Sequence, residues 1–170
     1  IPDGVTSIGD SAFVFCNGLK IVKIPDSVTS MGNGVFQFCP SLHQAYFQGN
    51  APSVNGAAGS ADNTVFQGQS GAVYYLPSTT GWGATFGGWP TASWNPTAQI
   101  GGPNFGIETN RFGFNITGTA NIPIVVEAST NLTGSAWVPL LTGTLTNGGI
   151  YFSDLQWTNY PSRFYRIRSP

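Results

Sequence analysis

Two cysteines and one histidine are the residues of this chain best suited to special chemistry. Cys16 and Cys39 occupy equivalent places in two similar segments, 23 residues apart, and His43 follows shortly after. These three side chains could contribute to a metal site, but their spacing does not match that of zinc sites, which usually bring together four ligands. We therefore expect neither a metal site nor a bound cofactor.

The two thiols have two structural interpretations. If equivalent positions stack one strand spacing apart, about 4.8 Å, the Cα atoms of Cys16 and Cys39 fall within the range that a disulfide allows, about 4.4–6.8 Å. Stacked side chains run parallel, however, and a free cysteine packs well as a small apolar residue. We favour two buried thiols over a disulfide. Because no basic residue flanks either one, we expect no reactive nucleophile.

The other polar residues give no sign of a catalytic centre. The sequence lacks the Gly-x-Ser-x-Gly turn of α/β-hydrolases and a glycine-rich phosphate loop between a strand and a helix. Asp3 and Asp26 occupy the same position in the two similar segments, where they are suited to capping exposed turns. Asp154 and Arg163 are expected to form a structural ion pair. We expect a protein that is not an enzyme.

The composition limits the class of protein. Hydrophobic residues make up 41% of the 170 residues, but charged residues only 8%, against about 25% in an average soluble domain. Solubility must then depend on hydroxyl and amide side chains, as is common in secreted β-proteins. The formal net charge of −1 gives no electrostatic reason to expect nucleic acid as a partner. No apolar run approaches the roughly 18 residues of a membrane-spanning helix, so we expect no membrane insertion.

Internal repeats are the elements that must position these residues. The segment 1–9 (IPDGVTSIG) returns 23 residues later as 24–32 (IPDSVTSMG), and the match continues through the two cysteines. A period of this length is typical of a solenoid, in which each repeat buries its apolar side against its neighbours. We expect one short strand per repeat, at 20–25 and 43–47, and we expect these strands to stack in parallel.

A third repeat is degenerate. Residues 47–54 match the start of the repeat, and residues 65–67 match 35–37 at a spacing of 30, so that about seven residues are inserted at 55–61. Terminal repeats are expected to be atypical because they cover the open end of the stack. The aromatic residues in and after this repeat would form such a lid, or else an exposed platform on which sugar rings could stack. They are Tyr74, Trp82, Trp89 and Trp94.

The repeats resemble a known family. The pattern Ile-Pro-x-x-Val-Thr-Ser-Ile-Gly-x-x-Ala-Phe-x-x-Cys-x-x-Leu is similar to the BspA-like leucine-rich repeat of bacterial surface proteins. The segment that ends in Trp94-Asn95-Pro96 looks like the closing segment of such arrays, so the resemblance covers about residues 1–96. It implies a leucine-rich-repeat solenoid in a secreted or cell-surface bacterial protein involved in adhesion and ligand binding. It implies no catalytic residues.

The sequence changes in character after residue 96. Residues 97–103 have the composition of a linker, and short alternating segments separated by turn residues then fill 104–170. This spacing predicts a small antiparallel β-sandwich of Ig-like class, with a hairpin at Asn147-Gly148. The segment resembles the short C-terminal β-domains of secreted proteins from environmental bacteria, which implies no activity. The expected fold is therefore mostly β, with a short leucine-rich-repeat solenoid before the sandwich.

The leading functional hypothesis is a non-enzymatic extracellular or cell-surface module for binding and adhesion. Its partner would be a protein or a glycan. The ligand surface is expected on the strands of the first two full repeats, at Lys20, Val22, His43 and Ala45. A carbohydrate-binding accessory module that uses the aromatic platform is a further alternative.

The rival hypothesis is a structural subunit of an extracellular filament or matrix. The chain begins inside a repeat, which favours a fragment or a processed form and leaves a solenoid edge at Ile1, Val5 and Ile8. An unpaired edge invites pairing with another chain, here a copy of itself. Head-to-tail contacts that do not close produce filaments.

Overall fold

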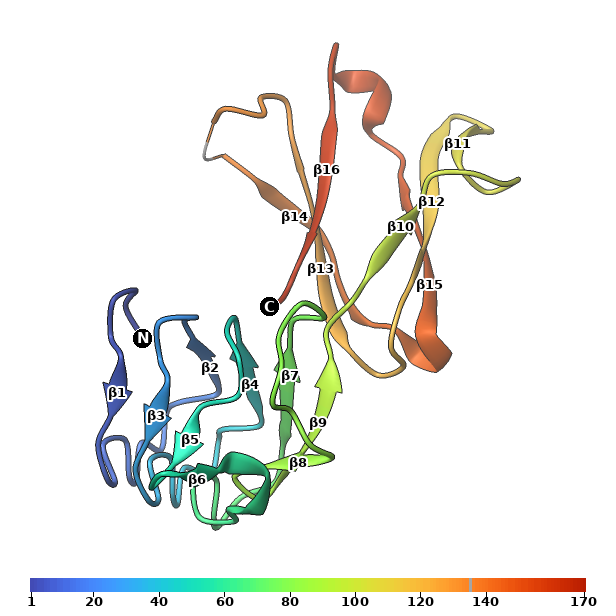
Figure 1. Ribbon diagram of the computed structural model, residues 1–170. Helices are drawn as coiled ribbons and strands as arrows, with labels where there is room; N and C mark the ends of the chain where they lie inside the picture. The colour runs from blue at the N-terminus through green and yellow to red at the C-terminus, as the bar shows by residue number, and fades with distance from the viewer. Residues whose placement is uncertain (135) are drawn as a thin grey trace. The chain divides into compact units, whose positions relative to one another are not determined.

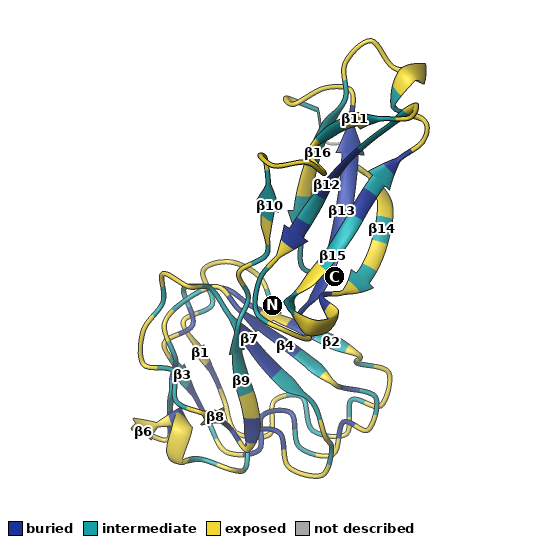
Figure 2. Cartoon of the chain, turned by 90° about the vertical axis from the view of Figure 1, so that its right-hand side faces the viewer, coloured by how far each residue is buried: buried dark blue, intermediate teal, exposed yellow. Residues whose placement is uncertain are grey.

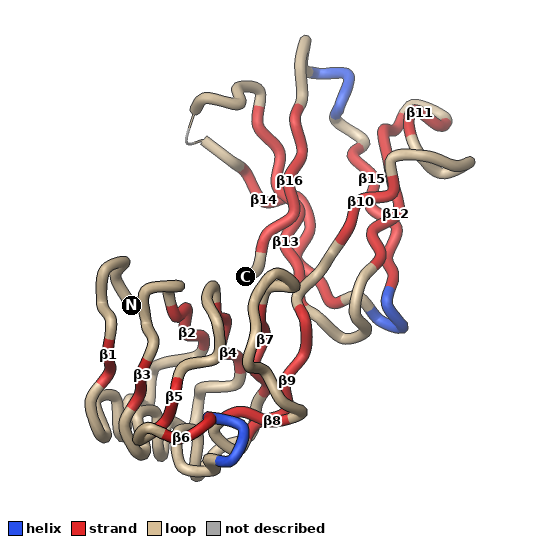
Figure 3. Tube along the Cα trace, in the orientation of Figure 1, coloured by secondary structure: helices blue, strands red, loops and turns tan. Residues whose placement is uncertain are grey.

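The protein is mostly β in its computed structural model, which describes residues 1–134 and 136–170. This part of the chain contains sixteen strands and three short 3-10 helices (Figure 1). Figure 3 shows how much of the chain is strand and connecting loop. The chain divides into two compact units, Ile1–Trp94 and Asn95–Pro170, and each is described here by itself.

Two narrow sheets of short strands build the first unit. One sheet has the spatial order β1 (Ser7–Ile8), β3 (Ser30–Met31), β5 (Ser53–Val54) and β6 (Ala57–Ala58). The other has the order β2 (Ile21–Ile24), β4 (Gln44–Phe47), β7 (Ala72–Tyr75), β9 (Trp89–Ser93) and β8 (Thr85–Phe86). A single short helix, η1 (Gly59–Ala61), follows β6 within the inserted segment.

The sequence period is also the register of these sheets. Ser7 pairs in parallel with Ser30, and Ile21 with Gln44, each 23 residues further along the chain. The third repeat continues both ladders, because β5 pairs with β3 and β7 pairs with β4, again in parallel. The predicted parallel stacking of 20–25 on 43–47 is therefore confirmed. The prediction of one strand per repeat is wrong, since each repeat supplies two.

The turns between strands are also bonded from one repeat to the next. The backbone N–H of Phe13 donates to the carbonyl oxygen of Val35 at 2.8 Å, and that of Phe36 donates to Val65 at 2.9 Å. Such bonds satisfy backbone groups that would otherwise be buried without partners. Each repeat is thus joined to its neighbour at three places, its two strands and its aromatic turn.

A column of aromatic rings runs through the core of the first unit. Phe13, Phe36, Phe66 and Trp89 stack in sequence, with ring centroids 5.2, 5.6 and 4.2 Å apart. The indole nitrogen of Trp89 donates to the carbonyl oxygen of Gln69 at 3.1 Å, so the buried ring leaves no unpaired donor. Figure 2 shows the buried residues of this unit along β4 and β7.

The second unit consists of antiparallel strands in two sheets. One sheet contains β10 (Thr97–Gln99), β11 (Gly106–Glu108), β12 (Arg111–Thr117) and β15 (Gly149–Asp154). In this sheet β10, β11 and β15 each pair with β12. The other has the order β14 (Val138–Thr144), β13 (Pro123–Ser129) and β16 (Phe164–Arg168). Two short helices, η2 (Thr146–Gly148) and η3 (Trp157–Asn159), flank β15.

Two predictions about the second unit need correction. The predicted linker 97–103 begins with a strand, because Thr97 pairs with Thr117 across β10 and β12, and the units divide between Trp94 and Asn95. The predicted hairpin at Asn147-Gly148 is absent, since the turn connects β14 to β15, which lie in different sheets. Both predictions were based on turn residues such as proline, glycine and asparagine. These residues indicate where the chain turns, but they do not indicate which strands will pair.

Buried ion pairs link the strands of the second unit. Asp154 and Arg163 form the predicted pair, with 2.5 Å between Oδ2 and Nε, and Tyr165 also donates to Asp154. The buried carboxylate of Glu127 accepts hydrogen bonds from Nε of Arg166 at 2.8 Å and of Arg168 at 2.6 Å. Burial alone would raise the pKa of Glu127, but the two arginines outweigh it and lower the pKa below its ordinary value.

The aromatic column makes a testable contribution to stability. Phe36 is completely buried within it, whereas Phe38 of the same repeat is 42% exposed. We expect Phe36→Ala to lower the free energy of unfolding by about 3–5 kcal/mol, because it leaves a cavity between two stacked rings. Phe38→Ala should cost about 1 kcal/mol or less. Urea denaturation checks both values, and equal losses would contradict the assignment of the column to the core.

Glu127 should make stability depend on acid pH. A carboxyl whose pKa is lower in the folded state stabilises the fold above its unfolded pKa, about 4.3, and loses that contribution as pH falls through the folded pKa. We expect Glu127→Gln to cost about 1.5–3 kcal/mol at neutral pH and to flatten the loss of stability on acidification below about pH 5. Thermal or urea unfolding across this range provides the measurement.

The matched control is Glu108→Gln. Glu108 lies 3.9 Å from Arg111, and both side chains are substantially exposed, so its removal should cost less than about 1 kcal/mol. An unchanged acid profile in the Glu127→Gln variant would argue against the proposed role of the two arginines.

Candidate functional site

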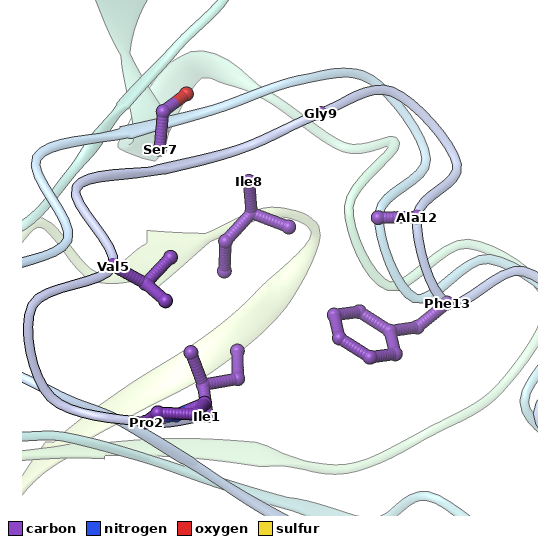
Figure 4. A pocket seen from close by; sticks show the side chains of 8 residues that line it. All are labelled: Ile1, Pro2, Val5, Ser7, Ile8, Gly9, Ala12 and Phe13. Carbon is purple, nitrogen blue, oxygen red and sulfur yellow. The ribbon is translucent and has the colours of Figure 1, made fainter.

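An apolar hollow of about 490 Å³ lies at the N-terminal end of the first unit. Figure 4 shows the side chains of Ile1, Val5, Ile8 and Phe13 pointing into it, while Ser7 points away. The first three are the residues of the predicted solenoid edge, and the structure brings them together. Phe13 was not part of that prediction, although its position in the repeat could have indicated it.

The equivalent residues of the next repeat are covered. Ile24, Val28 and Met31 are the equivalents of Ile1, Val5 and Ile8, and all three are buried. In the first repeat Ile8 is buried as well, whereas Ile1 and Val5 are half-buried. Phe13 stacks on Phe36 with one face, and its ring reaches the hollow on the other side. The apolar residues that line the hollow are therefore equivalent to residues that are buried in the next repeat.

The opposite end of the repeats is covered by the chain itself. β6 pairs antiparallel with β5, and β8 pairs antiparallel with the start of β9. Trp89 ends the aromatic column, and Phe86 packs edge-on against Phe47 at 5.1 Å. The two ends of the first unit are thus different surfaces.

The predicted ligand surface is only partly correct. Lys20 and His43 are exposed, but Val22 and Ala45 are buried in the core, with 6% and 0% exposed. Val22 and Ala45 lie within β2 and β4, where alternation turns them to the core, whereas Lys20 and His43 precede these strands and do not follow the alternation. Lys23 on β2 and Gln44 on β4 were not part of the predicted ligand surface, although Lys23 is exposed.

Tyrosines occupy the outward positions of the same sheet. Tyr46 and Tyr74 are paired in register and stack with their ring centroids 5.0 Å apart. The hydroxyl of Tyr46 donates to Oε1 of Gln44 at 3.2 Å. Burial raises the pKa of both tyrosines above the ordinary value, so both hydroxyls stay protonated at neutral pH.

The predicted aromatic platform does not form an exposed row. Trp89 lies in the core, and Trp82 stacks on Tyr75 at 5.0 Å and contacts Phe47 edge-on. Tyr74 is stacked on its neighbour, and Trp94 is half-buried. These contacts favour the alternative interpretation, in which the aromatic residues close the end of the repeats.

Both cysteines are free thiols. Cys39 is buried, with Sγ 3.0 Å from the carbonyl oxygen of Phe13, and its burial raises the pKa of the thiol. Cys16 is half-buried. Among residues 1–134 and 136–170, no three side chains of His, Cys, Asp or Glu gather as metal ligands. The same residues include no helix of the length and apolar character that crossing a bilayer requires.

Comparison with known proteins finds one family model that is similar to the N-terminal repeats. The family model of the BspA type Leucine rich repeat region (6 copies) matches residues 1–61, about a third of the chain. Neither the curated proteins nor the solved structures contain a match. Repeats of this type are typical of surface or secreted proteins. The repeats that form the start of both parallel sheets are thus similar to BspA-type leucine-rich repeats.

Proposed function

We propose that the first unit is a short leucine-rich-repeat solenoid that serves as a protein-interaction module of an extracellular or cell-surface bacterial protein, without enzymatic activity. The observation that carries the proposal is the in-register stacking of repeats in a segment that matches the BspA type. Repeats of this family are commonly associated with adhesion, which supports a binding role.

The packing explains why such a unit suits binding. Backbone bonds and stacked rings join each repeat to the next, so side chains on the sheets stand at fixed spacings of about 4.8 Å. A partner that binds such a surface pays little entropy for ordering it. The chemistry of recognition then depends on which side chains the strands present.

The ligand surface that we propose is a small basic patch beside β2 and β4. It consists of Lys20, Lys23, His43 and Gln44. Lys20 and Lys23 are the lysines of the first unit, which contains no arginine, and Lys20 and His43 lie one residue before their strands. Because positive charge in this unit is confined to the patch, an acidic protein surface is the partner that it favours.

Binding should therefore depend on the patch and on salt. We expect the Lys20→Ala/His43→Ala double variant to weaken binding to an acidic extracellular-matrix or cell-surface protein about tenfold, and we expect salt to weaken binding by the wild-type chain, because exposed charges are screened. An array of such proteins, followed by affinity measurement for each hit, tests this expectation.

Thr6→Ala is the control, since Thr6 is exposed on the other parallel sheet, directly before β1. Two outcomes would count against the basic patch as the ligand surface. One is that every protein that binds the wild-type chain binds the Lys20→Ala/His43→Ala variant and the Thr6→Ala variant equally well, and the other is that no protein on the array binds.

The hollow at the N-terminal end favours self-association as a second candidate function. The same hollow of a second copy could cover Ile1, Val5 and Phe13, which are half-buried in the single chain. A filament needs two complementary ends, whereas β6 and β8 cover the opposite end here. We therefore propose that two copies of residues 1–170 pair hollow to hollow, which produces a closed dimer instead of a filament.

Light scattering over a concentration series distinguishes these outcomes. We expect dimers at high concentration, and we expect Val5→Asp to keep the chain monomeric because it places a charge in the apolar hollow. Thr6→Asp is the neighbouring control and should leave the dimer intact. A monomer at all concentrations would remove the dimer, and filaments in electron micrographs would show that the covered end also assembles.

A further inference from the structure

The second unit has a polar sheet face that neither functional hypothesis uses. Along β12, Phe114 and Ile116 are buried, so the residues between and beyond them face the other way. Asn115 is one of these, and its direct partners are Gln99 on β10 and Tyr151 on β15. The pairing therefore places two amide side chains and one phenol in a single row across three strands.

A hollow of about 400 Å³ lies over this row. Its lining includes Gln99, Asn115, Thr117 and Tyr151, and Nε2 of Gln99 donates to Oγ1 of Thr117 at 2.7 Å. The volume is within the range of small-ligand sites, about 300–1,000 Å³. The lining supplies hydrogen-bond donors and acceptors next to one aromatic ring.

Gly113 allows Tyr151 to lie across the sheet. A Cβ at residue 113 would stand 2.2 Å from the hydroxyl oxygen of Tyr151 and 2.8 Å from the carbonyl oxygen of Phe152. The tyrosine thus extends from its own strand over the neighbouring one, in space that any side chain at 113 would occupy. This arrangement keeps the phenol against the sheet at the edge of the hollow.

Polar atoms on this face lack partners in the described part of the chain. The hydroxyl of Tyr151 and Nε of Arg111 are buried without a hydrogen bond, which is uncommon in native proteins. The guanidinium of Arg111 lies 5.6 Å from the centre of the Tyr151 ring and 3.9 Å from the carboxylate of Glu108. The two opposite charges leave the face close to neutral.

We propose that this face, formed by Gln99, Asn115, Thr117 and Tyr151, binds a neutral carbohydrate. A sugar ring has an apolar C–H face that packs on an aromatic ring, and hydroxyls around its edge that exchange hydrogen bonds with amides. Each amide both donates and accepts, as paired sugar hydroxyls require. An anionic ligand would need an unpaired cation, and the guanidinium here already has a carboxylate beside it. The proposal is independent of the basic patch on the first unit.

Affinity electrophoresis of the full chain tests the proposal with four soluble neutral polysaccharides, namely dextran, laminarin, xyloglucan and galactomannan. Alginate serves as the anionic comparison. We expect retardation by at least one neutral polysaccharide and none by alginate. Asn115→Ala should weaken that binding at least tenfold, and Tyr151→Ala should abolish it. Titration calorimetry then measures the change in affinity.

Tyr160→Ala is the matched control, because Tyr160 is an exposed tyrosine of the same unit outside this hollow. It should bind as the wild-type chain does. Asn115→Ala keeps the test decisive if Tyr151→Ala fails to fold, since only an amide on the surface is removed. The proposal would be overturned if Tyr160→Ala lost the binding or if Asn115→Ala left it unchanged. It would also be overturned if the wild-type chain bound alginate more strongly than the neutral polysaccharides, or bound none of the four.

Discussion

Backbone pairing between residues one repeat apart is the constraint on which the first unit depends. Each strand of a repeat bonds in parallel to the equivalent strand of the next, and the aromatic turn does the same. Identical side chains are therefore placed above one another, which explains why Phe13, Phe36 and Phe66 form a continuous stack. An isolated repeat could not bury these rings, so stability belongs to the stack and not to its members.

The same constraint gives the unit two unlike ends. Within residues 1–94, the first and the last repeat each have one side that no further repeat of this segment covers. At the C-terminal side the chain folds back through β6 and β8 and places Trp89 on the last phenylalanine. At the N-terminal side the corresponding surface remains an apolar hollow. The proposed self-association and the proposed binding by the basic patch would therefore use different surfaces of the unit.

The sequence was sufficient to predict the period, the parallel pairing of the longer strands and the division into two β units. It could not predict that Val22 and Ala45 face the core, because the alternation within β2 and β4 does not extend to the residues that precede these strands. The strands β1, β3 and β5 have two residues each, too few for an alternating pattern to be recognised. The exposed or buried state of Trp82 and Trp89 depended on ring contacts that spacing does not encode.

The face of the second unit that we propose to bind a carbohydrate could not have been found from the sequence either. Gln99, Asn115 and Tyr151 lie on three strands, and only the observed register brings them into one row. The first of these strands, β10, was not predicted because it has only three residues and is flanked by proline and glycine, whose presence indicates a linker. The glycine that makes room for Tyr151 has no distinguishing feature in a chain with 23 glycines.

Nuclear Overhauser effects across the repeats test the central claim most directly. The register predicts contacts between the rings of Phe13 and Phe36 and between the backbones of Ser7 and Ser30, each pair 23 residues apart. Observation of both sets would establish that the sequence period is the packing period. Contacts of Phe13 with Phe38 instead, or contacts confined to neighbours in sequence, would contradict the stacking on which the N-terminal hollow, the aromatic column and the basic patch all depend.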